Sequence, residues 1–227
     1  MTKFILSSIL LVALASSEVS GQFTDSCTSD VYAKIKQCYV TYMAGYNLTM
    51  TDTIPEYWAF HFARRDLLDA DGLHIQPYVC QLGNSLSDCL APYSCMGPNA
   101  YMNMNAANTT EATDYWIDLA VTQYQCGAGY NCKYYALTMT EFYCMAFCRD
   151  RYQPNIDQCD AQAVIDIGNG MDPCAAQQKD FNCQAAIYRN CCDFNAGVYI
   201  CNVDLAGSKA VNPACVNAGL VTCPAPR

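Results

Sequence analysis

The sequence predicts an all-α fold, in which an irregular helical domain is stapled by disulfides and followed by a loop-rich C-terminal tail. Two observations lead to this prediction. Apolar residues recur at the three- and four-residue spacing of helices, between the capping residues, glycines and prolines that mark helix ends. The chain also holds 17 cysteines among 227 residues, a content that is typical of disulfide-rich secreted proteins.

Residues 1–15 are typical of a secretory signal peptide. Lys3 is the only charged residue before the apolar run FILSSILLVALA, and Ala13 and Ala15 supply the small residues of a cleavage pattern. Cleavage after residue 15, 17 or 21 is compatible with the sequence. The apolar run is too short to span a bilayer, so we expect a secreted, extracellular protein without a membrane span.

All the cysteines follow this segment, and an oxidising compartment favours their pairing. The odd total allows at most eight internal bridges and leaves one sulfur, either free or joined to a second chain in a covalent homodimer. Spacing alone does not give the connectivity. The disulfide candidates are Cys27, Cys38, Cys80, Cys89, Cys95, Cys126, Cys132, Cys144, Cys148, Cys159, Cys174, Cys183, Cys191, Cys192, Cys201, Cys215 and Cys223.

Residues 27–205 are predicted to form one cysteine-rich helical domain. Its first helix carries Val31, Ile35 and Tyr42 on one stripe, and Gly45 is placed to end it. The domain continues through a second helix, in which Thr53 and Glu56 fit a capping box.

Further along, Gly72 is placed to end the second helix. Residues 96–109 are rich in Asn and Met and are predicted to form a surface loop. Asn108 is a candidate N-cap for the helix that follows this loop.

Thr138 and Glu141 form another capping box, and Pro154 is predicted to end the helix that they begin. The segment 177–192 carries cysteines and apolar residues on two faces, which indicates a buried helix with several cross-links. Residues 206–227 are rich in Gly, Asn, Pro and Ala, and we expect an irregular tail that disulfides tether.

Cys144 and Cys148 lie four residues apart on a predicted helix, so a nucleophile, metal ligands and disulfides are the possible roles. Zinc sites usually combine C-x2-C units with one another or with histidines. The chain has only His61 and His74, each isolated in the sequence. We therefore predict disulfides at these cysteines, with no metal and no cofactor.

No motif indicates catalysis. The chain has no G-x-S-x-G motif, and two histidines offer few partners for a nucleophile. Arg64 and Arg65, followed by Asp66, are interpreted as a solvated helix face with local ion pairs. We predict no catalytic residue and no enzyme. The formal net charge of −9 disfavours nucleic acid and anionic membranes as partners.

Two sequons for N-glycosylation occur in the predicted mature chain. Asn47-Leu48-Thr49 and Asn108-Thr109-Thr110 both fit N-x-[ST]. We expect both asparagines at the surface. A glycan on Asn108 is expected to compete with its role as a helix cap.

One part of the cysteine spacing resembles the insect odorant-binding proteins, which are small helical carriers of apolar ligands. The order is Cys144, Cys148, Cys183, Cys192 and Cys201, with gaps of 3, 34, 8 and 8 residues. The resemblance implies a carrier of small apolar ligands. The chain departs from it because no cysteine lies 25–30 residues before Cys144.

A longer stretch resembles a secreted, cysteine-rich helical domain of unknown function that is expanded in nematodes. Cys27 and Cys38 are followed by YVCQLGNSLSDCL, CKYYALTMTEFYCMAFC, NIDQC and DPCAAQQKDFNCQAAIYRNCC, so the match spans about 27–192. It implies no catalytic residues. Extra to the pattern are the Asn/Met-rich loop, Cys148, the doubled Cys191-Cys192, and Cys215 and Cys223 in the tail.

Related domains occur in egg-coat chondroitin proteoglycans, and Glu18-Val19-Ser20-Gly21 fits the acidic-x-Ser-Gly attachment pattern of such chains. Ser20 is therefore a possible site for a glycosaminoglycan, if cleavage falls after residue 15 or 17. The sequence as a whole predicts a secreted, non-enzymatic binding or matrix protein. The alternatives are a carrier of small apolar ligands and a chondroitin-bearing proteoglycan core.

Overall fold

The computed structural model describes residues 27–131 and 139–224, which form helices and connecting segments with no β-strand. The predicted all-α fold is therefore confirmed. The described residues divide into two compact units, 27–126 on the one hand and 127–131 with 139–224 on the other. We call them the N-terminal and the C-terminal unit. The predicted signal peptide and Ser20 lie outside the described residues.

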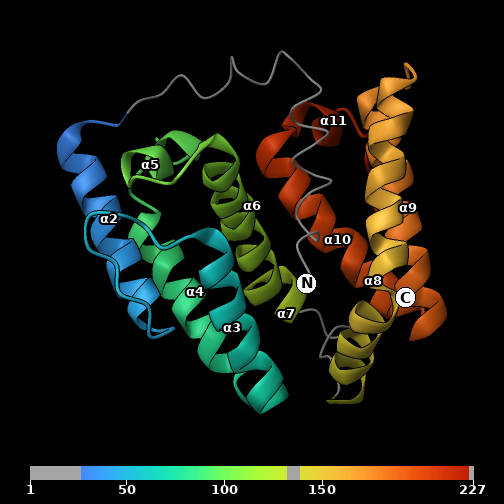
Figure 1. Cartoon of the computed structure of the whole chain (residues 1–227), viewed down its shortest axis with the longest axis horizontal. Helices are drawn as coiled ribbons and strands as arrows, with labels where there is room; N and C mark the ends of the chain where they lie inside the picture. Colours follow the sequence, from blue (N-terminus) through green and yellow to red (C-terminus); the bar gives the residue numbers. More distant parts are fainter. Residues whose placement is uncertain (1–26, 132–138, 225–227) are drawn as a thin grey trace. The chain divides into compact units, whose positions relative to one another are not determined.

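The N-terminal unit is built on α6, which packs against α4 and α5, while α2 packs against α4. Its described α-helices, labelled in Figure 1, are α2 (Ser29–Ala44), α3 (Tyr57–Asp71), α4 (Gln76–Leu90), α5 (Pro98–Asn103) and α6 (Thr109–Cys126). The short 3-10 helix η2 (Gly72–His74) follows α3.

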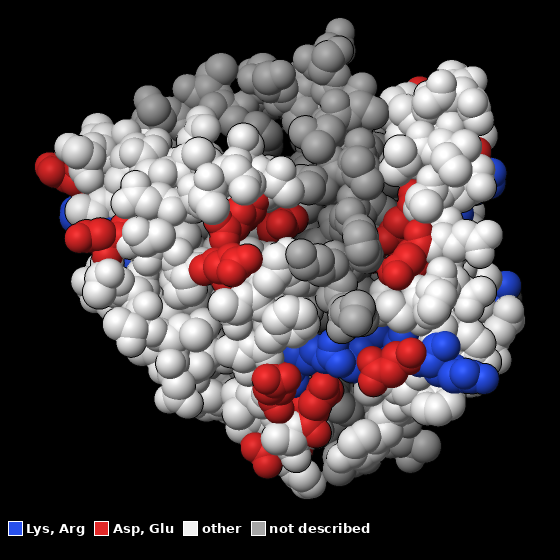
Figure 2. Space-filling model, viewed as in Figure 1, with Lys and Arg blue, Asp and Glu red and all other residues white. Residues whose placement is uncertain are grey.

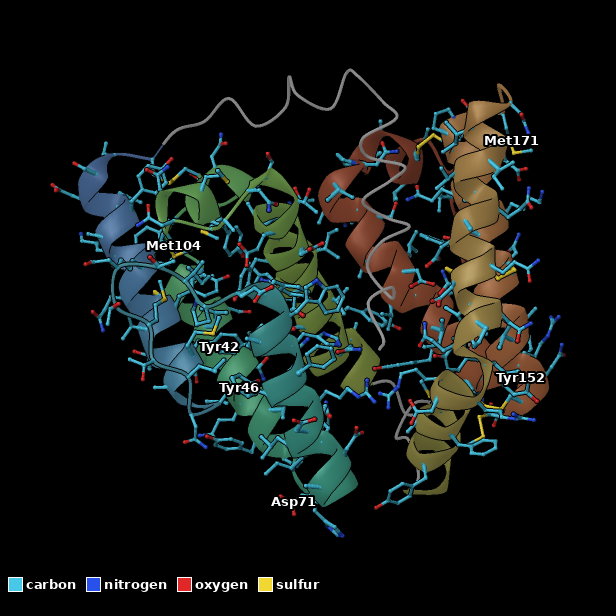
Figure 3. The ribbon with its side chains drawn as sticks, in the orientation of Figure 1. Tyr42, Tyr46, Asp71, Met104, Tyr152 and Met171 are labelled. Carbon is cyan, nitrogen blue, oxygen red and sulfur yellow. A yellow bond between two sulfur atoms is a disulfide. The ribbon has the colours of Figure 1, made fainter. Side chains whose placement is uncertain are left out.

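Tyrosine dominates the core of this unit. The rings of Tyr39 and Tyr101 meet edge to face with centroids 5.4 Å apart, and Tyr101 stacks on Tyr115 at 5.5 Å. Tyr42 and Tyr46, labelled in Figure 3, are also buried. Such ring pairs stabilise a core beyond the area that they bury, by about 0.5–1.5 kcal/mol each.

The C-terminal unit is built on α9, which packs along both α8 and α10. Its described helices are α7 (Ala128–Asn131), α8 (Met139–Gly168), α9 (Pro173–Cys191), α10 (Phe194–Val211) and α11 (Pro213–Asn217). A short turn joins α8 to α9. Another short connection at 192–193 joins α9 to α10.

Helix ends follow the sequence in several places. Gly45 caps the end of α2, and Gly72, at φ 59°, caps the end of α3. Three helices begin with a side-chain oxygen that accepts from a backbone N–H three residues on: Asn108 from Glu111 at 2.9 Å, Asp172 from Ala175 at 3.0 Å and Asp193 from Ala196 at 2.8 Å. The predicted N-cap at Asn108 is confirmed.

The prediction of a capping box at Thr53 and Glu56 is wrong. Glu56 itself occupies the N-cap position of α3, and its side chain makes no capping hydrogen bond. The Thr138–Glu141 box falls outside the described side chains. The prediction that Pro154 ends its helix is confirmed locally. Within α8 a first helical segment stops at Tyr152, whose φ of −113° and ψ of 16° are not helical, and a second segment continues to Gly168. The two segments meet at a kink because proline lacks the N–H that the preceding turn needs.

Two segments predicted to be irregular are helical. Within 96–109, α5 begins with Pro98 as its first residue, and it buries Ala100 and Tyr101 against the aromatic core. In the predicted tail, α10 runs on to Val211 and α11 follows. Burial of apolar side chains outweighs the weak local preference of Asn and Gly for turns in both segments.

Eight disulfides link the described helices, three in the N-terminal unit and five in the C-terminal unit. They are Cys27–Cys95, Cys38–Cys89, Cys80–Cys126, Cys144–Cys192, Cys148–Cys191, Cys159–Cys183, Cys174–Cys215 and Cys201–Cys223. The remaining cysteine, Cys132, lies outside the described residues. Because the other sixteen are paired, it has no cysteine left to pair with inside its own chain. The cysteines that are extra to the nematode-domain pattern, including Cys148, Cys215 and Cys223, are all paired.

Gly197 lets α10 approach α9 closely. A Cβ at this position would lie 2.5 Å from the carbonyl oxygen of Ala185 and 2.9 Å from Cβ of Arg189. The backbone oxygen cannot move aside without shifting α9. The space between the two helices therefore requires glycine.

We expect Gly197→Ala to lower the free energy of unfolding by about 1–3 kcal/mol, because the methyl group overpacks the contact between α9 and α10. Guanidinium unfolding followed by circular dichroism measures the change. Gly168→Ala is the matched control, because a Cβ at this position meets nothing within 4 Å. Alanine is also a better helix former than glycine, so this substitution should raise the free energy of unfolding by up to about 1 kcal/mol. Equal effects of the two substitutions would contradict this packing argument.

Candidate functional site

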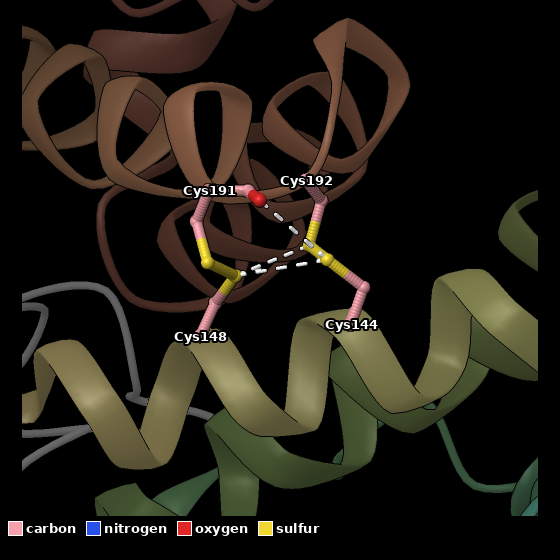
Figure 4. A group of neighbouring side chains, drawn as sticks. All are labelled: Cys144, Cys148, Cys191 and Cys192. Atoms are coloured by element: carbon pink, nitrogen blue, oxygen red, sulfur yellow. Dashed lines mark hydrogen bonds between the residues drawn. A yellow bond between two sulfur atoms is a disulfide. The ribbon is translucent and has the colours of Figure 1, made fainter.

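Four cysteines come together between α8 and α9, and they are the one group in the described residues whose side chains could jointly ligate a metal ion. Two disulfides, Cys144–Cys192 and Cys148–Cys191, lie side by side there (Figure 4). All four sulfurs lie within 4.8 Å of one another. We call this group the four-cysteine cluster.

The cluster follows from two local features of the chain. Cys144 and Cys148 are four residues apart on α8, so both project from one face of that helix. Cys191 is the last residue of α9, and Cys192 leaves the helix with φ −109° and ψ −86°. On a continuous helix, adjacent side chains point in different directions. The end of α9 instead allows both neighbouring cysteines to bond to α8.

The cluster sits on an apolar support. Cys148 is fully buried and packs with Ile156, Tyr188 and Ala196. Cys144, Cys191 and Cys192 are partly buried against the same group. The prediction of disulfides at Cys144 and Cys148 is confirmed.

A cleft of about 350 Å³ runs along the same pair of helices, beyond the kink in α8. Its apolar lining includes Ala163, Ala176, Ile187 and the Cys159–Cys183 disulfide. This volume falls at the lower end of the range for small-molecule sites.

An ion pair lies at the end of the cleft toward the α8–α9 turn. Lys179 Nζ donates to Asp166 Oδ2 at 2.7 Å, and Gln162 donates to the other carboxylate oxygen at 2.8 Å. The hydrogen bond from Lys179, followed by that from Gln162, lowers the pKa of Asp166 below its usual value. This end of the cleft therefore combines a cation with an amide and a carboxylate.

Buried carboxylates lie behind the cleft in the core of the C-terminal unit. The amide of Gln184 donates to Asp160 at 2.8 Å and to Asp180 at 3.1 Å. Asp204 lies near both, and burial followed by the charges of Asp180 and Asp160 raises its pKa well above the usual range. Asp180 also lines the cleft, so the cleft wall is continuous with an acidic interior.

The N-terminal unit holds a buried ion pair. Arg64 makes a two-pronged contact with Asp118, in which Nη1 donates to Oδ2 at 2.9 Å and Nη2 donates to Oδ1. Its guanidinium also lies 4.9 Å from the centre of the Phe60 ring. The interpretation of Arg64 as part of a solvated face is wrong, because it pairs with a residue 54 positions away. Arg65 makes the predicted local pair with Asp69.

The histidines considered for catalysis lie in unrelated surroundings. The ring contacts of His61 are to Tyr57, Trp58 and Phe62, so it belongs to an aromatic layer. His74 is exposed in η2. The four-cysteine cluster lies in the other unit.

Both sequon asparagines are exposed, and Asn47 adopts a positive φ of 57° in the turn after α2. Asn108 caps α6 through its side-chain oxygen. A glycan is attached to the side-chain nitrogen, which does not make this bond. The expected competition between cap and glycan therefore need not arise.

No family model, no curated protein and no solved structure matches this chain. Among the described helices, none combines the length and the apolar character needed to cross a membrane. What can be said of this protein therefore rests on its own residues.

Asp114 gives the N-terminal unit a measurable pH dependence. It is buried on α6, one turn from both Glu111 and Asp118. Burial, then the charges of Glu111 and Asp118, raises its pKa from 3.8 to about 7. The folded state therefore holds the proton more tightly than the unfolded state, and stability is lost as the pH rises from about 4 through about 7.

We expect Asp114→Asn to raise the free energy of unfolding at pH 8, by up to about 4 kcal/mol, and to change it little at pH 3.5. The amide removes the cost of ionising a buried carboxyl. Thermal unfolding at both pH values measures this difference. Asp52→Asn is the control, and it should lower the free energy of unfolding at pH 8, the opposite direction. The exposed Asp52 accepts a hydrogen bond from Lys36 at 2.9 Å, and its pKa is lowered, so its charged form favours the folded state. A gain at pH 3.5 equal to that at pH 8 would contradict the assignment.

Proposed function

We propose that this chain is a secreted, extracellular protein that binds a partner or builds matrix through its surface, and that it is not an enzyme. The observation that carries the proposal is the set of eight disulfides, which ties the helices of each unit to one another. Disulfides persist in oxidising compartments, so an extracellular location fits them.

The distribution of disulfides supports a role in presenting a rigid surface. Cys80–Cys126 joins α4 to α6, Cys174–Cys215 joins α9 to α11, and Cys201–Cys223 secures the end of the described chain to α10. Each bridge adds roughly 2–4 kcal/mol of stability, mainly by restricting the unfolded chain. A surface fixed in this way resists unfolding and proteolysis outside the cell.

The charge of the surface narrows the class of partner. Acidic side chains lie in separate groups over both units on the face drawn in Figure 2. With a formal net charge of −9, the chain repels nucleic acid and anionic membrane at long range. With nucleic acid and anionic membrane disfavoured, we propose a protein or a glycan of the extracellular matrix as the partner.

The absence of enzymatic activity is part of the proposal. In the described residues, two groups of charged side chains have internal partners: Arg64 pairs with Asp118, and Asp160 and Asp180 share the Gln184 amide. Arg64, Asp118 and Asp160 are thereby engaged in packing, and of these charged groups only Asp180 also lines the cleft. The resemblance to nematode egg-coat domains leads to the narrower proposal that Ser20 carries a chondroitin chain.

Alkylation of the secreted protein tests the disulfide basis of the proposal. We expect iodoacetamide, applied under denaturing conditions without reductant, to label at most one cysteine per chain, namely Cys132. Mass spectrometry measures the label, and non-reducing electrophoresis distinguishes a labelled monomer from an unlabelled covalent dimer.

Cys132→Ser is the control, and it should abolish both the label and any covalent dimer. Labelling of most cysteines would contradict the extracellular proposal. Digestion with chondroitinase tests the narrower proposal. If Ser20 carries a chondroitin chain, the protein should run as a smear in electrophoresis before digestion and as a sharp band after it. Ser20→Ala should run as a sharp band without digestion.

A second candidate function is transport of small apolar ligands. The cleft of about 350 Å³ favours it, because Ala163, Ala176 and Ile187 provide apolar walls and Lys179 lies beside them. Lys179 is paired with Asp166, and Asp180 also lines the cleft. This arrangement suits an apolar molecule with a hydrogen-bonding head, such as a fatty alcohol or a protonated fatty acid.

We expect a fluorescent fatty acid to bind to the purified protein and to be displaced by an unlabelled one. Ala163→Trp, which fills the cleft, should abolish the signal, whereas the same substitution at the exposed Ala161 should leave it unchanged. Failure of the wild-type protein to bind the probe, or equal binding by both variants, would contradict a carrier role at this cleft.

A further inference from the structure

We propose that the four-cysteine cluster, once reduced, is a binding site for a single thiophilic divalent cation of the zinc class. The proposal concerns a second state of Cys144, Cys148, Cys191 and Cys192, and it stands independently of the proposed extracellular function. In the oxidised state these residues are disulfides. In the reduced state the same backbone places four thiolate ligands around one point.

The spacing of the sulfurs fits tetrahedral coordination. A Zn–S bond of about 2.3 Å places the ligands of a tetrahedral site about 3.8 Å apart. The sulfurs of Cys144 and Cys148 are 3.9 Å apart, and those of Cys148 and Cys192 are 3.1 Å apart (Figure 4). Reduction breaks the S–S bond within each disulfide. Small rotations about the Cα–Cβ bonds can then separate the two sulfurs of each former disulfide to about the same 3.8 Å.

The backbone supplies the ligands in two pairs, as structural metal sites do. One pair comes from a single turn of α8, and the other comes from the two neighbouring residues at the end of α9. The Cα atoms of Cys144 and Cys192 are 5.9 Å apart, and those of Cys148 and Cys191 are 6.1 Å apart. No movement of one helix along the other is needed to gather the four sulfurs.

The surroundings favour a closed structural site. Cys148 is fully buried, and the apolar Ile156, Tyr188 and Ala196 pack with it. Four thiolates without a cation would be unstable in such surroundings because burial disfavours charge. A divalent cation reduces the total charge to −2.

The redox step balances with a dithiol as the co-reactant. Two dithiol molecules deliver four electrons and four protons to the two disulfides, and each dithiol is oxidised to its own disulfide. Four protein thiols result. When the cation binds, each sulfur gives up its proton and donates an electron pair to the metal, so up to four protons are released.

Cobalt titration of the reduced chain tests the proposal. The full mature chain is reduced with dithiothreitol under argon, freed of reductant by gel filtration, and titrated with Co²⁺. We expect one equivalent to give the intense d–d absorption of a tetrahedral thiolate site, and Zn²⁺ to bleach it. With Zn²⁺ bound, iodoacetamide should label these four cysteines more slowly than the other thirteen, by a factor of about ten.

Two double variants give the matched comparison. Cys148→Ser/Cys191→Ser and Cys159→Ser/Cys183→Ser each remove one disulfide between α8 and α9, but only the first removes proposed ligands. We expect the first to lose the cobalt band and the second to keep it. Equal loss in both variants, protection of a different set of cysteines, or no band in the wild-type chain would overturn the proposal.

If reduction unfolds the chain, circular dichroism can still test the proposal by measuring how much helix the metal restores. Binding to a structural site restores folding, so Zn²⁺ should then recover helical signal in the wild-type chain and in Cys159→Ser/Cys183→Ser. Recovery in Cys148→Ser/Cys191→Ser to the same extent would also overturn the proposal.

Discussion

Covalent cross-linking between helices is the constraint on which the rest of this structure depends. Both units bury polar groups that a core would normally exclude. Asp114 lies between two other carboxylates on α6, and Asp204 lies near Asp160 and Asp180. Gln177 and Ser208, almost fully buried, have side-chain atoms without a hydrogen-bond partner. Each such group costs on the order of 1–3 kcal/mol. Disulfides that destabilise the unfolded chain by a similar amount offset these costs.

The same constraint applies to each unit by itself. Every described disulfide joins two residues of one unit, and the two cores differ in kind. The N-terminal core is a layer of tyrosine rings closed by the Arg64–Asp118 pair. The C-terminal unit contributes fewer of the largest fully buried side chains, and buried cysteines such as Cys148 and Cys201 belong to its core clusters. A unit with fewer large side chains thus carries five of the eight cross-links.

The fold class was predictable because it depends on residue patterns that persist over many turns. The helix ends at Gly45, Gly72 and Asn108 were predictable for a local reason, since a glycine or a capping side chain acts within one turn. The helix α5 was not, because its Asn- and Met-rich sequence becomes helical only when Tyr101 meets the aromatic core. Likewise, nothing near Arg64 indicates that its partner is Asp118, 54 residues away. Connectivity was unpredictable for the same reason, because sulfur pairing is set by the packing of helices that are remote in sequence.

The four-cysteine cluster shows why spacing rules and structure answer different questions about cysteine. Rules for zinc sites look for C-x2-C units, whereas here one pair comes from a helical turn and the other from adjacent residues released by a helix end. The geometry that permits two parallel disulfides also permits four metal ligands, because both require sulfurs gathered within a few ångströms. Geometry therefore does not choose between the two states. The redox potential of the surroundings determines which state forms. Oxidation before a cation binds gives the two disulfides, whereas a cation bound to the reduced chain would protect the thiolates from oxidation. The secretion that we propose would carry the chain from one condition to the other, and the order of these events would then decide which state the cluster holds.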